Sequence, residues 1–365
     1  MGEIQDYYHW FLLVYVDNFS IFGMLIDINI FKMQITACYK VSDLGKITHF
    51  LRLHIVHDRS KNTLSISQEQ YIWWVLTQFA MADCTLAYTP FPARTKLQMN
   101  TSGMPDPNLH EKYQQIVSSL MDTILCSHPD ICFVVTWLTQ YGTNPTQTHM
   151  NTALHVLWYL KDTHHYQLTY GRNDCTVLIG YSNSDWAVDM DDRRSTTGYC
   201  YTLAGACIAW QKRKQRTATL SLTEAEYMAL TETTKHGQWA IQLLQQLDFE
   251  VDTIELYSDS LGACAIAENP VHHSCTKHIE IWLHYIRDAM QDGTFEFSSV
   301  PTKDNIADAP TKSFARDRHQ FLGKKLGLVN GSRVLWTWYA WAISVNTYGL
   351  SRAMANTTLL YLTLN

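Results

Sequence analysis

The stretch that decides the fold opens with Gly180-Tyr181-Ser182-Asn183-Ser184-Asp185-Trp186 and ends at Lys312. Three later runs belong to it: Thr223-Glu224-Ala225-Glu226-Tyr227, Ile254-Glu255-Leu256-Tyr257-Ser258-Asp259 and Asp304-Asn305-Ile306-Ala307-Asp308. Their apolar spacing predicts that the first and third runs end short strands, that the second lies on an amphipathic helix, and that the fourth opens a late helical segment. The side chains of Asn183, Glu226, Asp259 and Asp308 can therefore converge from separate elements.

Such a set of side chains suits a two-metal nuclease. Carboxylates are hard oxygen ligands that favour Mg²⁺ or Mn²⁺ over zinc. Two such ions, about 3.5 to 4 Å apart, would activate water and stabilise the leaving oxygen of a phosphodiester. Glu226, Asp259 and Asp308 are therefore candidate catalytic residues and metal ligands, although a glutamate in a first helical turn is ordinarily a surface acid that complements the helix dipole.

Five sequence motifs, in a fixed order, carry a resemblance to a known family. They are Asp191-Asp192-Arg193-Arg194-Ser195-Thr196-Thr197-Gly198-Tyr199, Ser221-Leu222-Thr223-Glu224-Ala225-Glu226-Tyr227-Met228-Ala229, Asn269-Pro270-Val271-His272-His273, Lys277-His278-Ile279 and Ala307-Asp308-Ala309-Pro310-Thr311-Lys312. In order and spacing they resemble the carboxy-terminal part of a copia-type retrotransposon polyprotein, over about residues 10 to 327. The resemblance implies the end of a reverse transcriptase, a connection and a ribonuclease H.

The resemblance and the local patterns together give the expected architecture. We expect an α/β (α+β) chain with a reverse-transcriptase palm remnant, a helical connection, and a ribonuclease H-like mixed sheet flanked by helices. The expected segments are a truncated palm and thumb remnant at 1–90, a linker and helical connection at 91–172, a ribonuclease H-like domain at 173–327, and a tail outside the family at 328–365. We expect this tail to be poorly ordered and not to span a membrane, because Thr, Ser and Asn dilute its apolar run.

One site position departs from the family pattern, which has aspartate where Asn183 stands. Asp185 lies two residues further on, so in a strand it points to the same side as Asn183. One such step spans about 6.6 Å, which is large against metal–oxygen bonds of about 2.1 Å. We count Asn183 and Asp185 among the candidate catalytic residues and expect severely reduced cleavage.

A second departure concerns the polymerase. The run from Phe11 to Gly23 predicts a hairpin with its tip at Asp17-Asn18. The family has two metal-binding acids at this tip, and Asn18 replaces the second with an uncharged amide, so metal affinity should fall. The family's other metal-binding aspartate lies upstream, and only sixteen residues precede Asp17, so we expect polymerisation to be lost. The family also has glycine where Arg52 stands, which argues against close backbone packing there.

Composition sets further bounds. The 365 residues are 46% hydrophobic, enough for substantial cores, and the formal net charge is −6. Binding to a polyanion must therefore depend on local basic patches. Nine cysteines without a CxxC pair and the absence of a cleavable signal indicate an intracellular protein, cytoplasmic or nuclear.

The strongest basic run is Lys212-Arg213-Lys214-Gln215-Arg216, beside Trp210. It is typical either of a solvated turn or of a contact to the phosphates of an RNA–DNA hybrid. We expect nucleic-acid contacts from Arg193, Arg194, Lys212, Arg213, Lys214, Lys277 and His278. A zinc site built from His272, His273, Cys275 and His278 is disfavoured, because no paired ligands stand at finger spacing.

These observations predict a retrotransposon-derived fragment whose family synthesises DNA on RNA and cleaves RNA in RNA–DNA hybrids. The expected partner is such a hybrid or a template nucleic acid, and the expected cofactor is Mg²⁺ or Mn²⁺, as two ions if the site is intact, with no small-molecule cofactor and no membrane. Two alternatives stay open. One is a non-catalytic nucleic-acid-binding or interaction protein that retains the fold, and the other is a genomic relic without a stable product.

Overall fold

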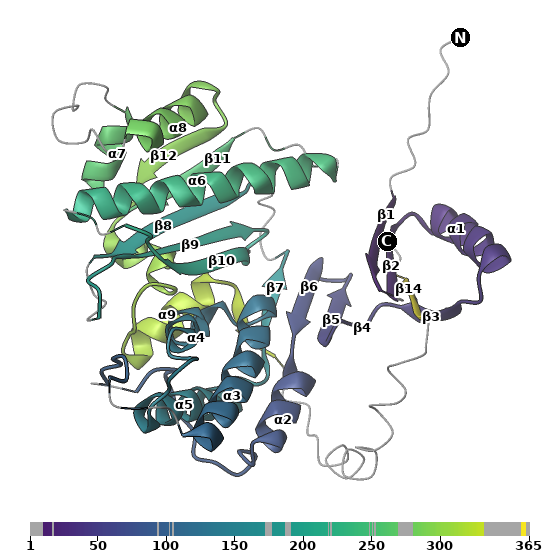
Figure 1. Cartoon of the computed structure of the whole chain (residues 1–365). Helices are drawn as coiled ribbons and strands as arrows, with labels where there is room; N and C mark the ends of the chain where they lie inside the picture. The colour runs from purple at the N-terminus through teal and green to yellow at the C-terminus, as the bar shows by residue number, and fades with distance from the viewer. Residues whose placement is uncertain are drawn as a thin grey trace. The chain divides into compact units, whose positions relative to one another are not determined.

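The computed structural model describes residues 10–331, apart from 17, 93–94, 102, 104–105, 172–176, 187–190, 218, 220, 248, 250, 252 and 269–279, and also residues 359–362. It divides into two compact units, the first from Met1–Leu51 and Ser332–Asn365 and the second from Arg52–Gly331. Figure 1 shows the elements of both. The four segments expected from the sequence stay a prediction, since compact units need not coincide with functional segments.

The first unit is a small sheet with one helix. The strands of this sheet are β1 (Trp10–Tyr15), β2 (Asn18–Gly23), β3 (Ser42–Lys46) and β14 (Leu359–Leu362), and the helix is α1 (Leu25–Cys38). The short strand β4 (His49–Phe50) is not part of this sheet. The sheet order is β1-β2-β14-β3. β1 and β2 pair antiparallel from Trp10 with Gly23 to Tyr15 with Asn18, which confirms the predicted hairpin but places Asn18 in strand β2 and not at the tip. Ile21 and Ile28 form its buried core.

The second unit begins with a hairpin and a helical layer. β5 (Leu53–Asp58) pairs with β6 (Thr63–Ser67), followed by α2 (Glu69–Gln78), α3 (Pro107–Cys126), η1 (Pro129–Ile131), α4 (Cys132–Thr139) and α5 (Gln147–Thr163). Apolar stripes on these helices bury one core, centred on Leu76, Leu120 and Leu157. Between α3 and α5, residues 129–139 are divided between a 3₁₀ turn and a short helix.

Arg52 opens this second unit with a φ of +67°, in the left-handed region that favours glycine. Its guanidinium lies 2.6 Å from Asp122 and stacks over the ring of Tyr71. The expected glycine position is therefore a backbone turn, and the arginine occupies it at a conformational cost.

β7 (Tyr166–Tyr170) joins β6 on one side and β13 (Leu328–Asn330) on the other. Both pairings are antiparallel. The expected loose tail therefore does not begin before residue 331, because Leu328–Asn330 is held by a ladder with Tyr166–Leu168.

The remaining residues build a five-stranded mixed sheet. Its strands are β8 (Ile179–Asp185), β9 (Thr196–Leu203), β10 (Ala206–Lys214), β11 (Ile254–Ser258) and β12 (Phe295–Ser299), in the order β10-β9-β8-β11-β12. β10, β9 and β8 pair antiparallel, whereas β11 is parallel to both β8 and β12. This is the mixed sheet that the ribonuclease H resemblance implies.

Alternation along β9 gives this sheet two buried faces. Tyr199 and Tyr201 pack in a core with α6 (Leu222–Gln246) and α8 (Glu280–Gln291), while α7 (Leu261–Glu268) lies beside them. Cys200, between the two tyrosines, packs instead with the 3₁₀ turn η5 (Ile306–Asp308) and helix α9 (Arg316–Lys325). The turn η4 (Thr302–Asp304) precedes η5. α6 and α9 therefore lie on opposite faces of the sheet (Figure 1).

Candidate active site

Sheet topology brings the expected site residues together. β8 and β11 are parallel neighbours with Ser182 opposite Ser258, so Asn183 and Asp259 follow at adjacent strand ends. Glu226 lies in the first turns of α6, and Asp308 ends η5 against the opposite face. Asn183, Glu226, Asp259 and Asp308 together form the acid cluster. Their meeting depends on the parallel pairing, which places the carboxyl ends of both strands at one edge of the sheet.

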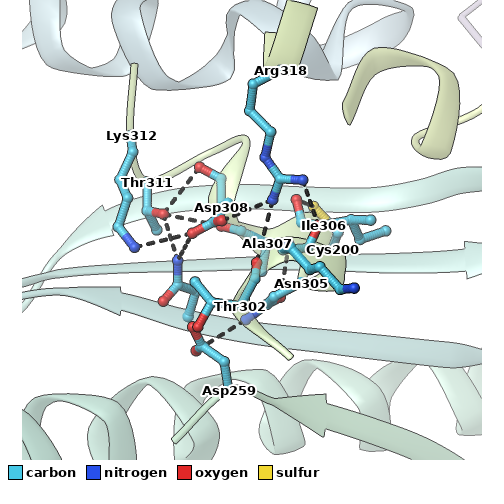
Figure 2. A network of polar contacts seen from close by, with 12 residues as sticks. Cys200, Asp259, Thr302, Asn305, Ile306, Ala307, Asp308, Thr311, Lys312 and Arg318 are labelled. Carbon is cyan, nitrogen blue, oxygen red and sulfur yellow. Dashed lines mark hydrogen bonds and ion pairs between the residues drawn. The ribbon is translucent and has the colours of Figure 1, made fainter. Parts of the chain in front are cut away.

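Asp308 is the most heavily bonded member of the acid cluster. Its side chain is 3% exposed, and its Oδ1 accepts from Asn183 Nδ2 at 2.8 Å and from Lys312 Nζ at 3.0 Å. Its Oδ2 accepts from Arg318 Nη2 at 3.2 Å, as Figure 2 shows. Two cations and an amide thus balance the buried carboxylate, as burial of a charge requires.

A glycine makes this contact possible. Gly198 is the strand partner of Asn183, and a Cβ there would collide with the side chain of Thr311. Thr311 in turn accepts from Asn183 Nδ2 at 2.9 Å. The glycine of the first family-like motif, Asp191 to Tyr199, is therefore needed so that the η5 segment can approach β9 and β8.

Asp259 is held by a residue that sequence reasoning missed. Asn305 Nδ2 donates to Asp259 Oδ1 at 3.2 Å and to the carbonyl of Ser182 at 3.0 Å, and its Oδ1 accepts from the N–H of Ala307 (Figure 2). One amide thus ties β8, the end of β11 and η5 together. Asn305 stands three residues before Asp308, and this spacing was the only local signal of its role.

Glu226 carries the largest electrostatic perturbation in the acid cluster. Burial, followed by the negative charge of Asp259, raises the pKa of Glu226 to about 8, against the opposing effects of Lys312 and the N–H of Ser184. Glu226 therefore carries a proton at neutral pH when no cation is near. Burial likewise raises the pKa of Asp185, against the charges of Lys312 and Lys212.

Two buried oxygens of the acid cluster lack a hydrogen-bond partner among the described residues. Within the described residues, Glu226 Oε2 and Asn183 Oδ1 are buried and have no hydrogen-bond partner. An unpaired buried acceptor costs about 1–3 kcal/mol, so these two atoms are where a cation or a donor would be most strongly bound. The donor set of three carboxylates and an amide oxygen fits the hard-ligand chemistry of Mg²⁺ or Mn²⁺.

The side chains nevertheless do not form a compact coordination sphere. In the described part of the chain, no three His, Cys, Asp or Glu residues lie close enough together to hold one metal ion. The reason is visible at Asp308, whose oxygens face Lys312 and Arg318. Burial lowers the pKa of Lys312, but the charge of Asp308 and its hydrogen bond have the larger combined effect and raise this pKa. The Lys312 ammonium therefore stays charged.

The basic run after Trp210 is not the solvated turn that was one of its two expected structures, and contact of Arg213 and Lys214 with phosphates stays a prediction. Lys212 and Lys214 belong to β10, so the run up to residue 214 is strand and not turn. Lys212 is only 8% exposed, lies 3.9 Å from the ring centroid of Phe133 and donates to the carbonyl of Phe133. This ammonium therefore ties β10 to α4 and is not presented to solvent.

Three of the other four expected basic residues that the structure describes are paired with acids. Arg194 and Lys214 share Asp192, at 3.5 and 2.8 Å, and Arg213 lies 3.6 Å from Glu232. Arg193 is exposed with a φ of +59°. Lys277 and His278, the disfavoured zinc ligands and Asp17 lie outside the described residues, whereas Asn18 opens β2.

Comparisons with known proteins bear on the same regions. The family model for reverse transcriptase (RNA-dependent DNA polymerase) matches residues 7–93. The Pol polyprotein of transposon TNT 1-94 from Nicotiana tabacum is 34% identical over 87% of this chain and 24% of its own length. That of transposon RE2 from Arabidopsis thaliana is 32% identical over 87% of this chain and 22% of its own length. An uncharacterised mitochondrial protein of Arabidopsis thaliana is 32% identical over 63% of this chain and 94% of its own length.

Solved structures show a weaker likeness. The N-terminal RNase H domain of rv2228c from Mycobacterium tuberculosis is 14% identical, covering 41% of this chain and 97% of that one, with a TM-score of 0.29. A foamy viral protease–reverse transcriptase is 16% identical, covering 54% and 42%, with a TM-score of 0.30. TM-scores this low do not support an argument about function, and the strand order of the mixed sheet does not depend on them.

The class of protein is a fragment derived from a reverse transcriptase and ribonuclease H. Its palm-like hairpin, helical layer and mixed sheet with the acid cluster agree with this class. The chain belongs to the family of copia-type retrotransposon polyproteins and spans about a quarter of the length of the two polyproteins compared here. The resemblance and the fold class inferred from the sequence are confirmed. No helix among the described residues is both long and apolar enough to cross a membrane.

Proposed function

We propose that this chain binds RNA–DNA hybrids and cleaves their RNA strand slowly, with Glu226, Asp259 and Asp308 as the ligands of Mg²⁺ or Mn²⁺. The observation that carries the proposal is the pair of buried oxygens on Glu226 and Asn183, which have no hydrogen-bond partner among the described residues, together with the charges of Asp259 and Asp308 near Glu226. Bound there, the metal would supply an activated water and charge neutralisation at the leaving oxygen.

The chain's own residues explain the expected weakness. Asn183 offers a carbonyl oxygen without charge, and its amide nitrogen donates to Asp308. Lys312 and Arg318 already neutralise Asp308, so a divalent ion must compete with two built-in cations. Glu226 must also release the proton that burial and Asp259 favour before it can act as a ligand. Each effect lowers the affinity of the site for a cation.

The test is a cleavage assay on a labelled RNA–DNA hybrid with Mg²⁺ or Mn²⁺. We expect Asn183→Asp to raise the rate by about tenfold or more, a gain of about 1.4 kcal/mol in transition-state stabilisation. Glu226→Gln in the Asn183→Asp background should abolish the gain. Robust cleavage by the natural chain, lost on Glu226→Gln, would contradict the impairment, and no gain from Asn183→Asp would contradict the site assignment.

A second candidate is a nucleic-acid-binding protein without catalysis. It is favoured by one observation, the full set of internal donors on Asp308, which allows the acid cluster to persist as a structural network. Hybrid binding in EDTA together with no cleavage in Mg²⁺, even for Asn183→Asp, would select this candidate.

A further inference from the structure

Helix α9 presents one buried and one outer face. Its inner face carries His319 and Leu322, both buried, and Leu322 packs with Cys200 and Ile306 beneath the sheet. His319 Nε2 lies 3.0 Å from the hydroxyl of Tyr159 on α5. These contacts fix the rotation of α9, and they determine which of its side chains face outward.

One side of α9 carries alternating aromatic and basic side chains. Phe314, just before the helix, packs against the core of Cys200 and Ile306, and Arg318, Phe321 and Lys325 follow it at spacings of four, three and four residues. The Arg318 guanidinium lies 5.7 and 5.2 Å from the ring centroids of Phe314 and Phe321, and Lys325 Nζ lies 5.8 Å from that of Phe321. Phe321 is 38% exposed. The rings thus hold the cations in place by cation–π contacts.

Charge is concentrated on this segment in a chain that is acidic as a whole. Residues 312–325 hold the five basic residues Lys312, Arg316, Arg318, Lys324 and Lys325 and the single acid Asp317, against a net charge of −6 for the chain. A local excess of this kind is the electrostatic footprint of a polyanion site.

Lys312 and Arg318 are paired with Asp308, whereas the other three cations differ from the basic residues near β10. Arg194, Arg213 and Lys214 each lie within 4 Å of an acid. In the described part of the chain, Arg316, Lys324 and Lys325 form no ion pair with an acid, and all three are exposed. Lys324 and Lys325 also offset the negative end of the helix dipole, but this effect accounts for neither Arg316 nor the exposed Phe321.

Arg318 connects this side of α9 to the acid cluster. Its Nη2 reaches Asp308 Oδ2, while its side chain also donates to the carbonyls of Thr302 and Lys303 (Figure 2). Contacts of Phe321 with Arg318 and with Lys325 connect the acid cluster to the end of α9. We propose that Lys324 and Lys325, beside the exposed ring of Phe321, bind the phosphate backbone of the nucleic acid that occupies the acid cluster. The proposal rests on the nucleic-acid partner proposed above.

The test measures hybrid binding by fluorescence anisotropy in EDTA, where no cleavage occurs, over a series of salt concentrations. We expect Lys324→Glu with Lys325→Glu to weaken binding about tenfold or more at low salt and to reduce the salt slope by about two. The matched control is Lys96→Glu with Lys112→Glu, which changes the charge equally at two exposed lysines, one before α3 and one on it. This control should bind like the natural chain.

Three outcomes would overturn the proposal. The first is an equal loss of hybrid affinity in both double variants, and the second is an α9 double variant that binds the hybrid like the natural chain. The third is a natural chain that binds polyglutamate as tightly as it binds the hybrid. Unchanged circular dichroism and melting temperature exclude misfolding as the cause of a loss. A cleavage assay in Mg²⁺ on the same samples separates the two proposals. If the α9 double variant binds and cleaves the hybrid like the natural chain, only this inference is refuted. If the α9 double variant binds more weakly but the natural chain does not cleave, only the catalytic part of the proposed function is refuted.

Discussion

Removing the hydroxyl of Tyr159 tests the polar network that joins α9 to the helical layer. The Tyr159 hydroxyl donates to Asp130 Oδ2, and His128 Nδ1 lies 3.2 Å from the other oxygen of the same carboxyl. Because the Tyr159 hydroxyl has given its hydrogen to Asp130, its lone pair accepts from His319 Nε2–H at 3.0 Å. All of these side chains are buried, with Tyr159 and Asp130 each 3% exposed.

The magnitude follows from what Tyr159→Phe leaves behind. The phenyl ring keeps the packing of the tyrosine, so the transfer and cavity costs stay small. The loss consists of one hydrogen bond to a buried carboxylate, about 1.5–3 kcal/mol, and the N–H of His319, which is left without its acceptor. We expect the free energy of unfolding to fall by roughly 2–4 kcal/mol in total.

A second buried tyrosine supplies the control. Tyr227 is 0% exposed, and within the described residues its hydroxyl has no hydrogen-bond partner. Tyr227→Phe removes an unsatisfied polar atom, so we expect no loss of stability or a small gain.

The assay is urea unfolding of both variants followed by tryptophan fluorescence, with Trp158 adjacent to the network on α5. A loss below about 1 kcal/mol for Tyr159→Phe, or equal losses for both variants, would refute the reasoning.

Two further predictions concern pH and the backbone. Burial lowers the pKa of His319 from 6.5 against the attraction of Asp130, so His319 contributes full stability above its unfolded pKa and loses it as pH falls below that value. His319→Gln should therefore flatten the fall in melting temperature between about pH 7 and pH 5, and an unchanged slope would count against the assignment. At the left-handed Arg52, Arg52→Gly and Arg52→Ala both remove the ion pair with Asp122, so comparing them isolates the backbone. The glycine variant should be more stable by about 1 kcal/mol in urea unfolding, and equal stabilities would contradict backbone strain at this position.

Local periodicity was sufficient to predict the elements that carry the site. The strands expected to end near Asn183 and Asp259 are β8 and β11, and the amphipathic helix expected around Glu226 is α6. Both patterns depend only on near neighbours in sequence. The exact face of a helix is harder to predict: Leu243 of α6 is 40% exposed, while its neighbour Leu244 is buried. A slip of one residue on a helix turns a side chain by about 100°, which is enough to move it from the core to the solvent.

Long-range partners could not be predicted in this way. Lys212 sits in a basic run that looks solvent-exposed, yet Phe133 and Trp137, from a helix 79 and 75 positions earlier in the chain, take up its charge. The same applies to Asn305, Lys312 and Arg318, whose roles follow from where η5 and α9 lie against β8. Sequence motifs identified the carboxylates, but only the packing of both sheet faces identified the groups that neutralise them.

The substitution at position 183 is compatible with the fold for the same reason that it weakens the proposed chemistry. An aspartate there would face Asp308 as a second buried negative charge, and such a pair is stable only when a cation lies between the two carboxylates. Asparagine replaces this repulsion by a hydrogen bond of 2.8 Å, and its second donor contact to Thr311 holds the amide in that orientation. The natural chain therefore needs no divalent ion to keep β8 and η5 together. The contact between β8 and η5 therefore does not depend on metal affinity, because the Asn183 amide bonds directly to Asp308 where two carboxylates would need an ion between them.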